Sequence, residues 1–142
     1  MADQSLALKT EEALQLTAFD LGQTTAELRG TDKTEKTSPA VICVVEGGRE
    51  EDPYLSGNYW LQARVEVRSQ VHDTSVSVHQ SRVATTFDAM TDDAIAATLS
   101  AAVSGYNVHA VIPRGQETNN TETEMVDVLR LDIYCCARDI SA

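Results

Sequence analysis

Aromatic side chains are scarce in this sequence of 142 residues, at 5%, and basic side chains are outnumbered: 11 Lys and Arg stand against 22 Asp and Glu. The resulting net charge of −11 argues against a grip on nucleic acid, which needs clustered cations, and against a basic helix on a membrane surface. No apolar run approaches the length of a membrane span, and the first ten residues lack the features of a signal peptide. With 42% apolar residues, we expect one domain over residues 1–142, in the reducing cytoplasm and without a membrane partner.

Cysteine is also sparse. The three cysteines, Cys43, Cys135 and Cys136, do not have the spacing of zinc ligands. We expect them to be small apolar side chains, buried or half-buried. No metal or other cofactor is predicted.

The first predicted helix covers residues 3–21, with Asp3 as its N-cap. Leu8 and Phe19 fall on the side opposite its apolar stripe, which suggests a surface for a partner because a helix docked on one core needs only one stripe. The stripe itself consists of Leu6, Ala13, Leu14, Thr17 and Leu21.

Two more helices are predicted in the middle of the chain. One starts near residues 73–74 and runs to Met90. The next starts with Thr91 as N-cap, places two aspartates where the helix dipole favours negative charge, and ends at Gly105.

Four strands are predicted from short apolar runs and from alternation of apolar and polar side chains, which is clearest in the second strand. They cover residues 40–45, 58–69, 106–113 and 125–137, and the polar loops cover residues 29–39, 46–57 and 114–124. The fold class is therefore α+β: a four-stranded, mainly antiparallel sheet with helices packed on one face, in the order α-β-β-α-α-β-β.

No motif for catalysis or cofactor binding stands out. The chain has no G-x-S-x-G nucleophile elbow and no metal-ligand spacing of histidines, and we expect His79 to be a packed, hydrogen-bonded side chain. We therefore predict a protein that is not an enzyme. Two alternatives stay open: a small cytoplasmic α+β enzyme using His72, Asp73 and His109 in a cleft, or a ligand-binding domain.

The polar face of the predicted sheet carries residue types that are common at protein interfaces. Two interpretations are open for it: a solvated face with cross-strand charge pairs among Arg64, Glu66, Arg130 and Asp132, or an interface where arginines meet acidic loops of a neighbour. The candidate interface residues are Leu8, Phe19, Trp60, Arg64, Arg68, Arg130, Tyr134, Glu50 and Glu51.

The order of motifs resembles the small tail-terminator, or tail-completion, proteins of tailed bacteriophages (the lambda-type family). Gly57 to Val67 matches a strand of the type G-x-[YW] followed by alternating hydrophobic residues. A helix with a D-x₅-H-x₂-R pattern follows, here Asp73, His79 and Arg82, and then a helix that begins Asp92-Asp93. The closing strand, residues 129–140, matches the L-x-L type with Y-C and D-I.

The resemblance implies a virion structural protein that forms a homohexameric ring at the tail-neck junction, assembled in the host cytoplasm. Its implied partners are further copies of itself, the tail tube protein and a head-tail connector or stopper protein. The ring would cap the tail tube and end tail polymerisation, and DNA would pass through it without specific binding. The closest alternative is another neck protein, of the head-completion or stopper kind.

Overall fold

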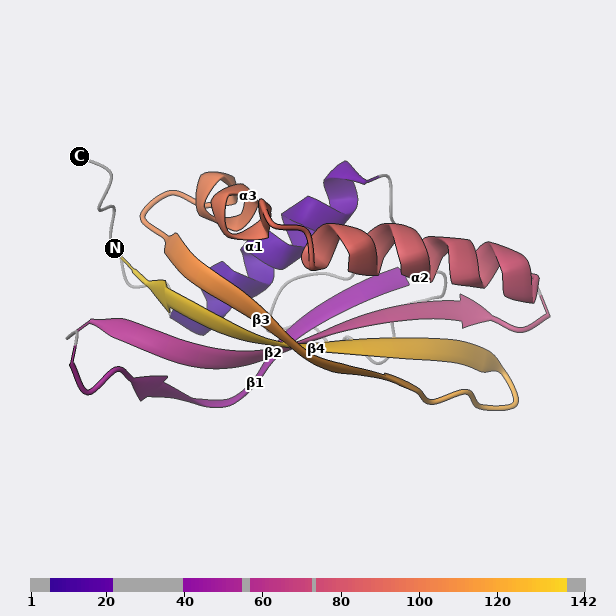
Figure 1. Cartoon of the computed structure of the whole chain (residues 1–142). Helices are drawn as coiled ribbons and strands as arrows, with labels where there is room; N and C mark the ends of the chain where they lie inside the picture. Colours follow the sequence, from indigo (N-terminus) through magenta and orange to yellow (C-terminus); the bar gives the residue numbers. More distant parts are fainter. Residues whose placement is uncertain (1–5, 22–39, 55–56, 73, 138–142) are drawn as a thin grey trace.

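The computed structural model describes residues 6–21, 40–54, 57–72 and 74–137 (Figure 1). Its elements follow the predicted order α-β-β-α-α-β-β and confirm the α+β class. In chain order they are α1 (Leu6–Asp20), β1 (Ala40–Glu51), β2 (Asn58–Gln70), α2 (Val76–Met90), α3 (Ile95–Ala102), β3 (Asn107–Thr118) and β4 (Glu124–Cys136).

The strands in the described residues form a four-stranded sheet in the order β1-β2-β4-β3, and every neighbouring pair is antiparallel. All three helices lie on one side of this strongly twisted sheet, as predicted (Figure 1). α1 and α3 lie side by side over one part of it, while α2 extends over the other end. Among the described residues, the opposite side of the sheet carries no helix, and we call it the open face.

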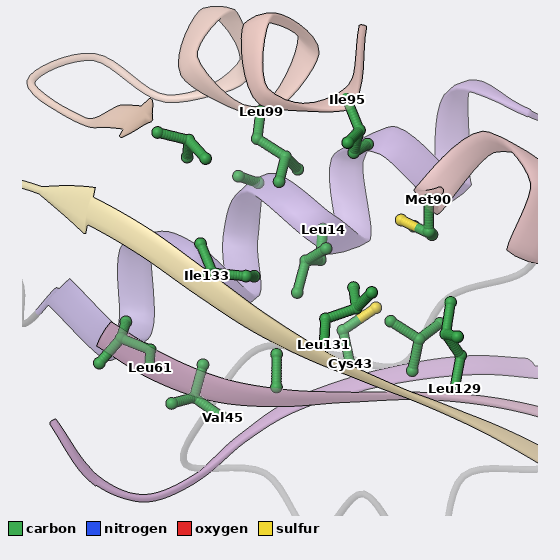
Figure 2. Close-up of a cluster of buried hydrophobic side chains, with 14 of the residues drawn as sticks. Leu14, Cys43, Val45, Leu61, Met90, Ile95, Leu99, Leu129, Leu131 and Ile133 are labelled. Carbon is green, nitrogen blue, oxygen red and sulfur yellow. The ribbon is translucent and has the colours of Figure 1, made fainter. Parts of the chain in front are cut away.

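The core lies between the helices and the sheet (Figure 2). Alternation along the strands sends one row of apolar side chains toward the helices, because successive side chains of a strand point to opposite faces. Leu14 of α1, Met90 of α2 and Leu99 of α3 are completely buried against this row. The row includes Val41, Cys43, Val45, Leu61, Ala63, Val65, Leu129, Leu131, Ile133 and Cys135. All three cysteines are buried, as expected, and form no disulfide.

Two of the predicted loops are wrong because the strands beside them are longer. β1 continues to Glu51 and pairs with β2 again after an irregularity between Glu46 and Glu50. The first six residues of the loop predicted over 46–57 therefore belong to β1. β3 continues to Thr118, with Gly115 at φ +138° next to a second irregularity, so the loop predicted over 114–124 shortens to residues 119–123. Backbone pairing with β2 and β4 holds these polar segments in the sheet. The third predicted loop, 29–39, lies outside the described residues.

The predicted helix boundaries also need correction. Thr91 is not the N-cap of α3 but the C-cap of α2, where its hydroxyl donates to the carbonyl oxygen of Phe87. α3 starts only at Ile95, because the Asp92 carboxylate accepts from the Ala94 amide and forms a tight turn first. Gly105 does adopt a left-handed conformation (φ +69°), but two residues after the C-cap of α3. The predicted N-cap of α1 lies outside the described residues.

α1 buries more polar groups than its sequence pattern predicts. Glu11 is 1% exposed and its carboxylate accepts from the backbone amide of Val45 on β1, at 2.9 Å. Lys9 donates to the carbonyl oxygen of Gly105, at 3.0 Å. These two charged side chains join α1 to the sheet and to the turn after α3. Leu21, predicted to lie in the apolar stripe, is instead exposed.

Among the described residues, none of the helices has both the length and the apolar character needed to cross a membrane.

Candidate functional site

The open face of the sheet presents the side chains that alternation directs away from the helices. Its central part is made of β2 and β4, whose residues pair directly: Trp60 with Tyr134, and Arg64 with Arg130. The predicted interface residues Trp60, Arg64, Arg68, Arg130 and Tyr134 therefore do share one face. The twist and pleat of four antiparallel strands place them in two groups, one aromatic and one charged.

The aromatic group is a row of three rings across three strands. Trp60 on β2 stacks on Tyr134 of β4 with ring centroids 4.8 Å apart, and His109 of β3 tilts against the other side of Tyr134 at 5.3 Å. The His109 Nε2 lies 3.2 Å from the Asn58 side-chain oxygen. Sequence reasoning missed His109 in this group because an irregularity in β3 between Val108 and Ala110 breaks the alternation there.

The Tyr134 hydroxyl donates to the carboxylate of Asp52, just beyond β1. This hydrogen bond to the neutral phenol raises the pKa of Tyr134, with a smaller contribution from desolvation. The aromatic row is thus fixed by polar contacts at its centre, Tyr134, and at one end, His109. Rigid rings of this kind lose little side-chain entropy when a partner covers them.

The charged group is a ladder of arginines and carboxylates that begins at Glu66. Glu66 is 6% exposed and lies between two arginines, with Arg64 Nε at 2.6 Å and Arg68 at 2.8 Å from its oxygens. Arg64 also reaches Glu46 of β1 at 3.3 Å, and Arg68 reaches Glu124 at 3.4 Å. A carboxylate this deeply buried requires such cations, because an unpaired buried charge is strongly unfavourable.

Arg130 extends the ladder toward both sheet edges. It contacts Glu46 of β1 and Glu117 of β3, each at 2.8 Å. The hydrogen bond and charge of Arg130 lower the pKa of Glu117, and the carboxylates in turn raise the pKa of Arg130. Next to it, Arg114 pairs with Asp132 at 2.5 Å.

The interpretation of this face as a solvated surface predicts cross-strand charge pairs. Such pairs are present, but two of the four residues have other partners than expected. Arg64 pairs with Glu66 as expected, whereas Arg130 and Asp132 pair with residues of the edge strands. Because each described arginine of this face already has a carboxylate of its own chain, the face offers balanced charge rather than a cationic patch. It can fit a polar protein surface, and it is poorly suited to hold a polyanion.

Of the four remaining predicted interface residues, three lie away from the open face. Glu50 and Glu51 are exposed, but they lie on the β1 strand opposite Trp60 and Tyr59 rather than in a loop. Phe19 of α1 is 64% exposed, on the helix side of the molecule, and Leu8 of the same helix is half-buried. Because directly paired residues point to the same face, Glu50 lies beside Trp60 on the open face, whereas Glu51, Phe19 and Leu8 do not form one surface with the arginine ladder and the aromatic row.

The alternative of a small enzyme places His72 and His109 in one cleft. His109 lies in the aromatic row that contains Trp60. His72 follows the other end of β2, where the last strand residue, Gln70, is ten residues beyond Trp60. At the rise of an extended strand this is on the order of 30 Å, so the two histidines do not share a site. Asp73 lies outside the described residues.

His79 confirms the prediction of a packed, hydrogen-bonded side chain and also forms a constellation that sequence reasoning missed. Its Nδ1 lies 2.7 Å from the Ser69 hydroxyl, and its Nε2 lies 2.7 Å from the Asp127 carboxylate. Serine, histidine and aspartate in this order resemble the parts of a hydrolase triad. However, Ser69 is completely buried and its hydroxyl also accepts from Arg82, so no substrate carbonyl can reach it in this conformation.

No three metal-ligating side chains come together in the part of the chain that the structure describes, which includes Glu50, Glu51 and Asp52. The arrangement that remains is an open sheet face with a rigid aromatic row and a balanced charge ladder, which is chemically a binding surface. Comparison of the chain with models of protein families and with curated proteins finds no match to either.

Proposed function

We propose that the protein is a virion structural protein, a ring-former of the tail-terminator kind that caps a phage tail tube and joins it to the neck. The observation that carries the proposal is the open face, where the aromatic row and the charge ladder lie together on the side of the sheet that no described helix covers. The order of sequence motifs that resembles tail terminators supports the same function independently.

The aromatic row fits the role of an interface centre. Trp60 and Tyr134 are half-buried, and they belong to the residue types that contribute most of the binding energy when a partner excludes water from them. The charge ladder around Arg64 and Arg130 fits the role of the polar surround, since balanced charges select a complementary partner and its register. A repeated surface of this kind closes into a ring when one patch meets a different patch on the next copy.

The strong negative charge of the chain also fits a ring around a DNA channel. A like-charged wall does not hold a passing duplex, and the arginines of the open face are neutralised within the chain. The proposed partners are therefore further copies of the chain, a tail tube protein and a connector or stopper protein, with no specific DNA contact and no cofactor.

Light scattering and negative-stain imaging of the purified protein, alone and with assembled tail tubes, test this proposal. We expect six-fold rings, either free or at the tube ends, and tubes that no longer lengthen once the protein is bound. A Trp60→Ala, Tyr134→Ala double variant should stay folded by circular dichroism and lose ring formation. A protein that stays monomeric and leaves tube growth unchanged would refute a terminator. Rings that bind only the head side would identify a different neck protein instead.

A further inference from the structure

A second surface lies on the helix side, where α2 runs beside the β3–β4 hairpin. Because α3 covers only the first part of β3, a groove of about 370 Å³ remains between α2 and the later part of that strand. The residues of α2 that line it recur at helical spacing, which gives one continuous wall. They are Val76, His79, Gln80, Val83, Ala84, Phe87 and Asp88, and Gln116, Thr118, Asn120, Met125 and Asp127 form the other wall.

Two of the described residues that line this groove, Asp88 and Asp127, are acidic, and none of them is a lysine or an arginine. Asp127 is held in place by residues of two elements. One carboxylate oxygen lies 2.7 Å from the His79 Nε2, and the other accepts a hydrogen bond from the Thr118 hydroxyl at 2.6 Å. Its side chain is still 21% exposed, and a carboxylate can accept about four hydrogen bonds. The Asp127 carboxylate is therefore fixed in position and can accept further hydrogen bonds.

Several other polar groups of the groove are unused. The side chains of Gln80, Asp88 and Gln116 make no hydrogen bond or ion pair with any described residue. Between Asp127, which contacts His79, and Asp88 lie the half-buried Val83 and the exposed Ala84, and Val76, which is 60% exposed, lies one turn before His79. Acceptors at both ends with apolar surface between them match basic side chains, whose aliphatic stems pack on apolar walls while their charged ends meet carboxylates.

The size of the groove limits the shape of its occupant. A helix as long as this groove fills on the order of 1,000 Å³, well above the 370 Å³ present, whereas an extended segment can insert its side chains. Asp88 lies nine residues beyond His79 on α2, and Asp127 contacts His79, so the two carboxylates are about 13 Å apart along the helix. Residues four apart in an extended chain span about the same distance.

We propose that this groove binds an extended basic segment of a partner protein, with two arginine side chains four residues apart that contact Asp88 and Asp127. The inference does not rest on ring formation, because the groove lies on the helix side and uses none of the open-face residues.

The test is a titration of the full chain, followed by amide NMR, with a capped five-residue peptide that carries arginine at positions 1 and 5 and serine or valine between them. We expect saturable shifts at Val76, Val83 and Gln116 that weaken as salt is raised. A peptide with citrulline in place of both arginines keeps the shape without the charge and should not bind. A peptide with arginines two residues apart should bind more weakly.

Asp88→Asn is the informative variant because Asp88 is exposed and has no described partner, so the fold does not depend on it. This variant should lower the affinity for the arginine peptide by about threefold or more. Asp93→Asn is the matched control, since it removes an exposed carboxylate outside the groove. The proposal is overturned if the arginine peptide gives no saturable shifts, if citrulline binds equally, or if both variants weaken binding to the same extent.

Discussion

His79 of α2 and Asp127 of β4 are 48 residues apart in the sequence, yet the His79 Nε2 lies 2.7 Å from the Asp127 Oδ2. The neighbouring contacts define the direction of each hydrogen bond. The Asp127 carboxylate accepts, so the His79 Nε2–H is the donor to it. In the imidazole tautomer with its proton on Nε2, Nδ1 accepts from the Ser69 hydroxyl, whose oxygen also accepts from Arg82. These contacts join α2 to β2 and β4 through the buried side chains of His79 and Ser69 and the partly exposed carboxylate of Asp127.

Replacing His79 by alanine should therefore destabilise the protein substantially. The change removes both hydrogen bonds of the ring and leaves the Ser69 hydroxyl and Asp127 with unsatisfied polar atoms. The expected loss in the free energy of unfolding is about 2–4 kcal/mol, measured by denaturant titration. The neighbouring variant Gln80→Ala, at an exposed position, should stay within about 0.5 kcal/mol of the wild type. Equal effects of the two changes would contradict the role given to His79.

Tyr106 makes stability depend on alkaline pH. Burial, reinforced by Cys135, raises the pKa of Tyr106 above its ordinary value of 10.0, against a smaller opposite effect of the Thr10 hydrogen bond. Between the unfolded and the folded pKa, the folded state keeps the phenol proton while the unfolded state releases it. The stabilisation is therefore complete below pH 10.0 and declines as the pH rises above it, by up to about 1.4 kcal/mol per pH unit.

Denaturant titrations at several pH values around 10.0 test this dependence, with Tyr106→Phe as the comparison. The Phe variant loses the hydrogen bond with Thr10, at 2.8 Å, and should be less stable by about 1 kcal/mol at neutral pH. Its stability should then fall less steeply with rising pH than that of the wild type. Parallel curves for both proteins would show that Tyr106 does not cause the alkaline decline.

The parts of the fold that the sequence predicts are those with a local pattern. β2 was predicted within one residue because Leu61, Ala63 and Val65 alternate with polar residues, and α1 and α2 follow from their apolar spacing. The later halves of β1 and β3 were missed because they are polar and belong to the sheet only through their pairing partners. The Glu117 contact with Arg130 is an example, since local sequence cannot identify it.

The same distinction holds for the candidate site. Alternation alone places Trp60, Arg64 and Tyr134 on one face, which is why the open face was predicted. It cannot say that every described arginine of that face is paired within the chain, nor that a strand irregularity adds His109 to the aromatic row. The His79 constellation brings three elements together, so only the tertiary structure can reveal it.

Glu66 should be the most sensitive member of the charge ladder. Glu66→Gln keeps the shape of the side chain and removes the charge that Arg64 and Arg68 share, at 2.6 and 2.8 Å. Because Glu66 is 6% exposed while its arginines are partly solvated, we expect a loss of about 1–3 kcal/mol in the free energy of unfolding. The difference from the wild type should shrink in high salt. Glu50→Gln, the same change at an exposed position of β1, should have little effect, and a comparable loss there would argue against the ladder.

Glu11 should anchor α1 to the sheet through its contact with the Val45 backbone amide. Its carboxylate accepts the amide of Val45 at 2.9 Å in the core, so Glu11→Leu leaves a buried N–H group without that acceptor. We expect a destabilisation of about 2 kcal/mol or more, even though leucine is more apolar than glutamate. Glu11→Gln can still accept through its amide oxygen and should lose less. Hydrogen exchange of the Val45 amide separates the variants, with clear protection in the glutamine variant and much faster exchange in the leucine variant. Equal protection in both would show that the amide does not depend on Glu11.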